Sequence, residues 1–426
     1  MAARQMFVSA AAGAHADNGG GYNPATYAGT RADYIALFSA NSGPFNTRTS
    51  DATGASATGI YTKAGAFTNA AIGMIAHIRG TNVVEGYYEI SARSDNTITV
   101  PAASMTGDAT NVVIGIGGAI TWAELTTMMT AASAATERAA PGDYFNIQGG
   151  DHSDAANGKY VMGATTTWTT DGTAISPISI VGCKLNWDVI NPTRMGTAGA
   201  GSVGNLLLDT THYPLLDYSG GNYQLGASGA DYIIYKSLMA TSAHTSAGGA
   251  LSVGAYCTVF GCSSVSTAND ADSCAIYNSG GDLVYMCDAS CTGASSNAAI
   301  FSISDTKVIG CYVTDSGGYG ISFTASTCVA IANVIYGCAN WGIYLNTTTA
   351  ARSMTCVGNT IFGKGIGTAD GDYTLPTYLI GNHVTNGGDH AFENPSDVGS
   401  PVVLAHNRTR DNTGGETSWL GDWATA

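Results

Sequence analysis

The residues of this chain most able to do chemistry are its carboxylates. Glycoside hydrolysis uses two carboxyl groups roughly 5 to 9.5 Å apart on one face. Neighbouring turns of a coiled chain could place aspartates at that separation, and the candidates are Asp270, Asp272, Asp288, Asp315, Asp370 and Asp372. None of them recurs at the same place in successive repeats of the sequence. We therefore interpret each one as a solvated turn residue and expect no catalytic site.

Two short clusters could hold a metal ion. They are Asp151-His152-Ser153-Asp154 and the calcium-like turn Asp370-Gly371-Asp372. Calcium takes six or more oxygen ligands, which neither cluster supplies. His383 and His406 are expected to face opposite ways, because side chains alternate along a strand. The sequence holds no Ser-His-Asp arrangement, phosphate loop or dinucleotide fingerprint, so we expect no metal and no cofactor.

A framework of structural repeats would have to position the carboxylates and metal-ion candidates. The sequence contains such a repeat. Two sets of positions recur in step through the C-terminal two thirds of the chain, with successive members of the first set 22 to 27 residues apart. The first set closes short apolar runs, and the second set follows a few residues later. The first set is Cys183, Asp209, Lys236, Cys262, Cys287, Cys311, Asn333, Asn359, Asn382 and Asn407, and the second is Leu251, Ile276, Ile300, Ile321, Ile343, Ile366 and Phe392. Two registers with one period and strand-like residues indicate a β-solenoid.

The residue types of the first set suit such a stack. Strands of successive coils lie about 4.8 Å apart, so that equivalent residues stack on one another. Stacked asparagines can pass hydrogen bonds from coil to coil, and cysteine is a small residue that fits the same buried corner. The sequence therefore predicts one continuous ladder in which a cysteine block is followed by an asparagine block.

This pattern, over residues 121–410, resembles the right-handed parallel β-helix proteins of the pectate-lyase-like group. Thr121-Trp122-Ala123-Glu124 forms a capping box at a helix start. Leu125, Met128, Met129 and Ala132 follow at helical spacing, and the helix is expected to end near Arg138. Members of the group commonly open with such a capping helix. The resemblance implies an all-β fold, a right-handed parallel β-helix of about eleven coils of about 24 residues behind this helix.

Composition and charge exclude several classes of function. The net charge is −15 with only 16 Lys and Arg, so nucleic acid is not an expected partner. No apolar run approaches the roughly 20 residues of a membrane-spanning helix, and the N-terminal stretch is an unconvincing secretion signal. The ten cysteines include no Cys-x-x-Cys spacing, and buried free thiols are expected, which suits folding in a reducing cytoplasm. The six cysteines outside the ladder could include a disulfide pair, and they are Cys257, Cys274, Cys291, Cys328, Cys338 and Cys356.

The N-terminal region lacks the period and contains several strand candidates. They are residues 59–61, 74–78 and 111–116, and a hairpin of 86–91 with 97–100 through Ser94-Asp95-Asn96. This pattern predicts a small antiparallel β module, and residues 59–100 resemble modules that precede β-helices in bacteriophage virion proteins. The expected organisation is an extended N-terminal arm at 1–56 lying on a neighbouring subunit, the attachment module at 57–118, the capping helix at 119–140, the parallel β-helix at 141–410, and a C-terminal cap at 411–426 with Trp419 and Trp423 over the last coil.

These observations favour a non-enzymatic virion structural protein. The catalytic patterns of the resembled group are missing: neither an Arg-x-Pro-x-x-Arg run nor the set Asn-Thr-Asp, Gly-His-Gly and Arg-Ile-Lys occurs. We expect a homotrimeric capsid decoration, fibre or tail-spike-like β-helix on the bacteriophage surface, attached to other virion proteins through its N-terminal region and able to bind a host surface glycan. The alternatives are a glycan-depolymerising tail spike or secreted polysaccharide hydrolase or lyase with carboxylates brought together between subunits, and a bacterial surface adhesin.

One aromatic row bears on the glycan hypothesis. Tyr277, Phe301 and Tyr344 occupy one phase of the repeat. If this row is exposed across successive coils it favours glycan binding. If it points inward it is part of the core.

Overall fold

The computed structural model describes residues 5–8, 46–68, 70, 72, 75–117, 119–120, 122–130, 139–152, 158–184, 189–195, 207–226, 230–245, 248–270, 273–293, 298–303, 305–314, 317–324, 327–345, 353–369, 376–385, 391–394, 402–410 and 417–419. The chain divides into two compact units. The first unit comprises Met1–Tyr160, Thr169–Ile190 and Thr211–Leu215, and the second comprises Val161–Trp168, Asn191–Thr210 and Leu216–Ala426.

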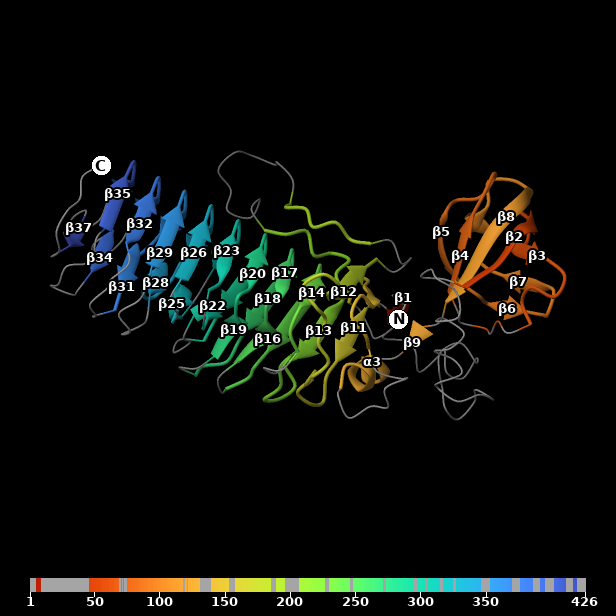
Figure 1. Ribbon diagram of the computed structural model, residues 1–426, viewed down its shortest axis with the longest axis horizontal. Helices are drawn as coiled ribbons and strands as arrows, with labels where there is room; N and C mark the ends of the chain where they lie inside the picture. The colour runs from red at the N-terminus through yellow and green to blue at the C-terminus, as the bar shows by residue number, and fades with distance from the viewer. Residues whose placement is uncertain are drawn as a thin grey trace. The chain divides into compact units, whose positions relative to one another are not determined.

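The second unit is a parallel β-helix whose coils each contribute one strand to three sheets (Figure 1). The first sheet contains β14 (Ile233–Lys236), β17 (Thr258–Phe260), β20 (Leu283–Tyr285), β23 (Lys307–Ile309), β26 (Thr327–Ile331), β29 (Ser353–Val357), β32 (Thr377–Ile380) and β35 (Val402–Ala405). The second contains β15 (Met239–Ser242), β18 (Ser263–Ser266), β21 (Asp288–Cys291), β24 (Tyr312–Thr314), β27 (Val334–Tyr336), β30 (Thr360–Phe362), β33 (His383–Thr385) and β36 (Arg408–Arg410). The third contains β16 (Gly248–Ala255), β19 (Ser273–Gly280), β22 (Ala298–Ser302), β25 (Tyr319–Phe323), β28 (Ile343–Leu345), β31 (Ile366–Thr368), β34 (Phe392–Asn394) and β37 (Thr417–Trp419).

The predicted parallel β-helix is therefore confirmed, with fewer coils than expected. Eight coils of the second unit run through all three sheets. In the first unit β10 (Tyr144–Gln148) and β12 (Ile178–Cys183) pair in parallel and begin two more, which makes ten described coils against about eleven predicted. The miscount comes from residues 191–195 and 207–210. They form an antiparallel excursion with a bridge between Arg194 and Leu208, and Asp209 within it was counted as a coil position.

The third sheet places the second predicted register in the core. Its members lie opposite one another in successive coils: Leu251, Ile276, Ile300, Ile321, Ile343, Ile366 and Phe392. All of them are buried, at 2 % exposure or less. Burial of a stacked column of branched apolar side chains holds each coil on the next. The same sheet continues to Trp419, because β37 pairs with β34.

The predicted ladder forms at the corner between the first and second sheets. Asn359 illustrates its bonding: its Oδ1 accepts the main-chain N–H of Asn333 at 3.0 Å and Nδ2 of the same residue at 2.9 Å. Its own Nδ2 donates to Ala330 O and to Asn382 Oδ1, both at 2.9 Å. Equivalent bonds link Asn333, Asn359, Asn382 and Asn407. Buried main-chain groups at the corner are satisfied by these side chains.

The cysteine block continues the same column. The Sγ atoms of Cys262, Cys287 and Cys311 donate to the carbonyls of Tyr235, Val259 and Val284, 3.4 to 3.6 Å away. The blocks meet where Cys311 N–H donates to Asn333 Oδ1 at 2.8 Å. None of the ten cysteines, all of which lie in the described residues, forms a disulfide, in agreement with the expectation of thiols, and nine of them are buried.

Two members of the predicted ladder are placed elsewhere. Leu238, not Lys236, occupies the ladder position in its coil, because Met239 pairs with Ser263, and Asp209 belongs to the excursion described above. Cys183, at the end of β12, is fully buried, and its Sγ contacts the carbonyl two residues before it, as the Sγ atoms of the ladder cysteines also do. The error at Lys236 has a local cause. Leu238 is neither cysteine nor asparagine, so its residue type does not mark the ladder position, although the turn before it, Ser237 at φ 54°, has the same conformation as Gly358 and Gly381 at φ 63° in later coils.

The first unit contains an antiparallel sheet of seven strands. Their order is β5 (Gly86–Glu89), β4 (Ile75–Arg79), β8 (Ala109–Gly117), β2 (Asn46–Ala55), β3 (Ile60–Thr62), β7 (Thr97–Thr99) and β6 (Ala92–Arg93), with a 3₁₀ turn at Ala102–Ser104. The predicted module is thus present, but it begins at β2, inside the predicted arm. β2 escaped prediction because its bulges against β8 break the alternation of buried and exposed residues.

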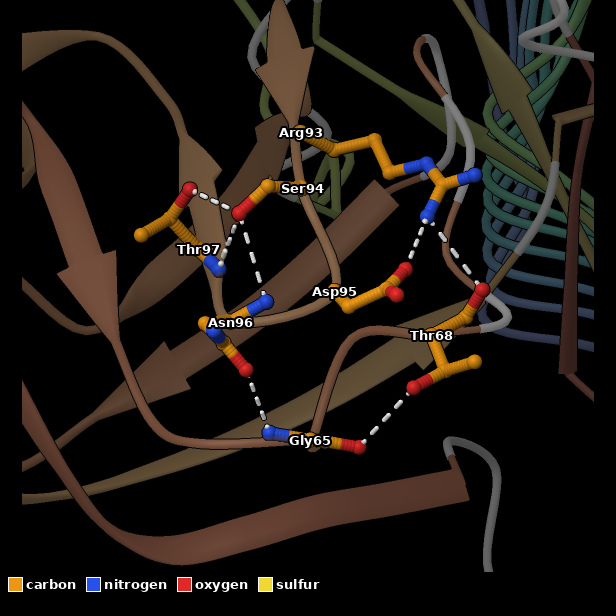
Figure 2. Close-up of polar contacts among 7 residues, drawn as sticks. All are labelled: Gly65, Thr68, Arg93, Ser94, Asp95, Asn96 and Thr97. Atoms are coloured by element: carbon orange, nitrogen blue, oxygen red, sulfur yellow. Dashed lines mark hydrogen bonds and ion pairs between the residues drawn. The ribbon is translucent and has the colours of Figure 1, made fainter.

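The predicted hairpin has the expected loop and a different partner. β7 pairs with β6, while β5 pairs with β4. Figure 2 shows the loop, in which Ser94 Oγ accepts the main-chain N–H groups of Asn96 and Thr97 at 3.2 and 3.1 Å. Asn96 Oδ1 accepts Gly65 N–H at 2.8 Å, and Arg93 Nη1 contacts Asp95 at 3.1 Å. A serine that accepts two following amides closes a turn without glycine.

The N-terminal arm and the helix also differ from expectation. β1 (Gln5–Val8) pairs in parallel with β10 and with β9 (Ala119–Ile120), and buries Val8 completely, so this part of the arm is a strand of the first unit. The helix α3 spans Trp122–Met128, shorter than predicted. Ala139 N–H binds the carbonyl of Met128, which a continuing helix would use internally. The predicted remainder to Arg138 lies outside the described residues. β11 (Lys159–Val161) and β13 (Leu215–Tyr218) complete the described strands.

Replacing the central ladder asparagine tests the contribution of the ladder. Asn359→Ala removes the acceptor of the Asn333 N–H and one donor to the Ala330 carbonyl in a buried corner, so we expect a loss of about 2 kcal/mol in unfolding free energy. Asn359→Cys keeps a donor to the same carbonyl and is expected to lose less. Urea unfolding of the three proteins measures this. Equal stability of the alanine variant and the wild type would contradict the role given to the ladder.

The turn glycines allow a test of backbone strain alone. A Cβ added to Gly358 or to Gly163 meets no atom within 4 Å, but only Gly358 has a positive φ, of 63°. Gly358→Ala should therefore lower the unfolding free energy by about 1 kcal/mol, and Gly163→Ala should not lower it. Comparison of their urea midpoints checks this, and equal effects of the two substitutions would exclude strain as the cause.

Candidate functional site

The outer surface of the third sheet carries the aromatic row singled out in the sequence. The core residue Ile276 points inward, and the following Tyr277 points outward and is half-buried. Its register partner in the next coil is Phe301, and Tyr344 occupies the same column two coils further on, with Ser322 between them. The row is therefore a surface feature of successive coils and not part of the core.

Neighbouring rings in this region stack across coils. The ring centroids of Tyr277 and Phe301 are 5.6 Å apart with planes 20° from parallel. Tyr319, from the adjacent column, stacks on Tyr344 at 4.5 Å and 4°. Such pairs hold the rings in fixed positions. Burial raises the pKa of Tyr277 and of Tyr319 above the usual tyrosine value, so both hydroxyls remain neutral donors at physiological pH.

Trp341 extends the aromatic surface by one more coil, because its indole covers the main chain at Gly367. A Cβ added to Gly367 would lie only 2.7 Å from the Trp341 ring. Lys364 Nζ lies 5.8 Å from the centre of the same ring, a cation–π contact. We call Tyr277, Phe301, Tyr319, Trp341, Tyr344 and Lys364 the aromatic strip.

The aromatic strip is suited to binding and not to bond cleavage. The stacked pairs turn one face of each ring toward its neighbour, so the strip offers ring edges, the outer faces at the ends of each pair, the tyrosine hydroxyls and Lys364 as contacts for sugars or other flat groups. Hydrolysis of a glycosidic bond needs a pair of carboxyl groups. The outward column from Ser252 through Tyr277 to Ser418 contains one carboxyl residue, Glu393, in β34.

The aspartates considered from the sequence do not converge on this strip in the described part of the chain. Asp288 is buried in the second sheet, where Arg194 Nη1 donates to its Oδ1 at 2.8 Å and Leu208 N–H donates to its Oδ2 at 2.6 Å. Burial raises the pKa of Asp288, and these two donors oppose the change. Asp288 therefore has a structural role. The prediction that it is a solvated turn residue is wrong. Asp270 lies in the turn before β19, and Asp272, Asp315, Asp370 and Asp372 lie outside the described residues.

Arg194 also anchors the excursion to the β-helix. Its Nη2 donates to Gly310 O at 2.6 Å, and Asn191 Oδ1 accepts Lys236 Nζ at 3.2 Å. Pro192 packs on Gly261, where an added Cβ would lie 2.1 Å from its ring. We call residues 191–195 and 207–210 the clamp hairpin. Its attachment points lie in four successive coils.

Asp282 is a buried carboxylate that the sequence analysis did not consider. Asp282, which is 2 % exposed, accepts Cys257 N–H at 2.7 Å and Gly280 N–H at 3.1 Å at the corner between the third and first sheets. Burial raises its pKa to about 7, while the two amide donors lower it and Asp231 raises it further. No motif marks this aspartate, because its environment arises only when the coils stack.

The metal-ion candidates give no site in the described residues. His152 bonds to the main-chain oxygen of Tyr213, while Ser153 and Asp154 lie outside the described part. His383 and His406 are both exposed. Among residues that the structure describes, no group of three or more His, Cys, Asp or Glu could bind a metal ion. None of the described helices has the length and apolarity to cross a membrane.

Comparison with known proteins adds fold likeness alone. No protein family matches the sequence, and no curated protein matches it. The crystal structure of pectate lyase Pel9A is 13% identical with a TM-score of 0.45, covering 71% of this chain and 76% of that chain. The catalytic domain of a GH87 alpha-1,3-glucanase in complex with tetrasaccharides is 8% identical with a TM-score of 0.32, covering 88% of each. At these values neither likeness supports a conclusion about activity.

The raised pKa of Asp282 predicts a pH dependence of stability. Folding favours its neutral form, so the contribution of that form is complete below about pH 4 and is lost as the pH rises through about 7. We expect the unfolding free energy of the wild type to fall between pH 5 and pH 7.5, and Asp282→Asn to reduce that fall. Asp270→Asn, in the same unit, is the control. An unchanged pH slope in Asp282→Asn would exclude this residue as the cause.

Proposed function

We propose that this chain is a non-enzymatic structural protein of a bacteriophage particle that displays a β-helix on the particle surface and contacts host surface glycan. The observation that carries the proposal is the aromatic strip on the outer surface of a regular parallel β-helix. The strip offers two stacked pairs of rings from four successive coils, which lie about 4.8 Å apart. This is the order of the length of one sugar unit, so an extended glycan could contact several coils at once.

The construction of the β-helix supports a role that requires a stiff, durable surface. The ladder satisfies buried main-chain groups at one corner, and the Ile276 column fills the interior with branched side chains. Only 16 of 426 residues are Lys or Arg, which leaves few sites for proteases that cut after basic residues. These are properties expected of a component that remains outside the host cell.

The first unit supports the attachment role. Its antiparallel sheet, from β2 to β8, differs in architecture from the parallel coils and precedes them in the chain. A module of another architecture before a solenoid is a natural means of attachment to capsid or tail, and repetition on a symmetric particle favours a homotrimer. In this proposal the protein is synthesised in the host cytoplasm and resides on the virion surface.

Electron microscopy of the native particle tests the virion role. The expected density has residues 46–117 on capsid or tail protein, with the β-helix directed outward. A free secreted oligomer with carboxylates of two copies facing one groove would overturn the proposal in favour of the polysaccharide enzyme. Antibody labelling with an epitope tag on an exposed loop gives the same answer for particles too heterogeneous to reconstruct.

Substitutions in the aromatic strip test glycan contact. Trp341→Ala and Tyr344→Ala each remove a ring face, and we expect each to weaken binding to host-derived polysaccharide about tenfold. Tyr336→Ala is the matched control, because Tyr336 is 44% exposed on the second sheet and lies outside the strip. Binding is measured by biolayer interferometry. Equal affinity of the wild type and the three variants would contradict glycan binding at the aromatic strip. Depolymerisation of the polysaccharide by the wild type would support the alternative of a polysaccharide enzyme.

A further inference from the structure

The outer surface of the first sheet is unusually apolar. Two outward positions of every strand from β14 to β35 stack in register, which gives sixteen positions. Twelve are apolar, and we call these twelve the apolar face: Ile234, Phe260, Leu283, Tyr285, Ile309, Val329, Ile331, Val357, Tyr378, Ile380, Val403 and Ala405. The other four are Lys236, Thr258, Lys307 and Thr355, so the sixteen positions include no carboxylate.

The second sheet shows that this composition is not a general property of the coils. Its sixteen equivalent positions include six apolar residues, and the other ten include His383, Arg408 and Arg410. Residues of the apolar face are intermediate in exposure, and Tyr285 is 38% exposed. Interior residues alternate with them: Val284, Val308 and Ala330 have no exposed surface. The apolar face is therefore a second apolar surface, outside the core.

The size of the apolar face is sufficient for a specific contact. Eight strands at about 4.8 Å give a length near 40 Å, and strands of three to four residues give a width of about 12 Å. Two such faces together would remove on the order of 1,000 Å² from water, which is the area that a specific protein interface needs. Contiguous apolar surfaces of this kind mark interaction sites.

We propose that copies of this chain associate through the apolar face. The proposal rests on the proposed function, in which the protein is a homotrimer, and adds the surface that the copies share. A chain with net charge −15 repels its own copies wherever carboxylates face one another. The sixteen outward positions of the first sheet contain no carboxylate. Two copies can therefore approach each other through this sheet at the lowest electrostatic cost.

The geometry also favours a copy of the same chain over an unrelated partner. An identical β-helix has the same spacing between coils, so rows of side chains can interdigitate along the face. The clamp hairpin borders the face at its first four strands, through Lys236, Gly261 and Gly310, and the strands from β26 to β35 lie beyond these attachment points. The face is narrow, which allows three copies to meet around one axis with their first sheets inward. Lys307 lies among the residues of the apolar face, at one of the other outward positions of the first sheet, and is exposed. Its long apolar stem allows the ammonium group to reach the rim of the face.

Two positions of one coil provide a matched pair of variants. Ile331 lies on the apolar face at the end of β26, and Val334 lies on the outer surface of the second sheet at the start of β27. Both are partly exposed, and they flank the ladder residue Asn333. Ile331→Glu combined with Ile380→Glu introduces two carboxylates into the face, while Val334→Glu introduces one outside it.

Sedimentation velocity over a range of concentrations measures the outcome, with circular dichroism as a check that each variant is folded. We expect the wild type to sediment as a multiple of 43.3 kDa, the double variant to dissociate with a dissociation constant raised about a hundredfold or more, and Val334→Glu to remain associated. If the double variant is too unstable, Ile331→Thr serves as a milder change with a smaller shift in the same direction.

Two results would overturn the proposal. One is a wild type that stays monomeric at micromolar concentration, and the other is a folded double variant that associates as strongly as the wild type. Either result leaves the attachment to particles and the aromatic strip untouched, because those are tested by microscopy and glycan binding. Conversely, the protein could associate through the apolar face and yet be absent from phage particles. That result would refute the virion role and support the interface between copies.

Discussion

The register of one coil on the next is the constraint on which the rest of this structure depends. Each corner between the first and second sheets turns the chain within a few residues, which buries main-chain donors where no strand can satisfy them. Asparagine solves this problem with one amide: Oδ1 of Asn359 accepts from the coil before it, and Nδ2 donates to the carbonyl of Ala330. Cysteine at the same position supplies the donor to that carbonyl column, as Cys311 does with Val284. Once the corners are fixed, every outward position is fixed in register with its equivalents.

That register turns single side chains into surfaces. Aromatic residues of four successive coils form the aromatic strip, and one or two apolar residues from each of eight coils form the apolar face. The two surfaces belong to different sheets and differ in character: the strip combines rings with hydroxyls and Lys364, whereas the apolar face is dominated by aliphatic side chains. A small sheet protein could not hold two extended surfaces of this kind, because each needs many coils to acquire useful area.

The sequence predicts the parts of the fold that repeat and fails where the repeat is interrupted. The Ile276 and Asn359 columns were predictable because their chemistry recurs at one period. The position of Lys236 was wrong because the true ladder residue of its coil, Leu238, is neither the cysteine nor the asparagine that marks the ladder elsewhere. The clamp hairpin was counted as a coil because its partners, Asp288 and Gly310, are about a hundred residues away. The outward direction of Tyr277 and the burial of Asp282 depend on which face a strand turns inward, which spacing alone does not decide.

The clamp hairpin has a consequence for how the protein comes apart under force. A solenoid held only by neighbouring coils unravels one coil at a time from a free end, with a small step for each coil. Here, Asn191 is tied to Lys236, Pro192 rests on Gly261, and Arg194 holds both Asp288 and Gly310. The coils from β14 to β23 are thus fastened by one segment that crosses all of them. Pulling from the C-terminus should release the coils of β35 to β26 in succession and then meet a block of four coils that yields together.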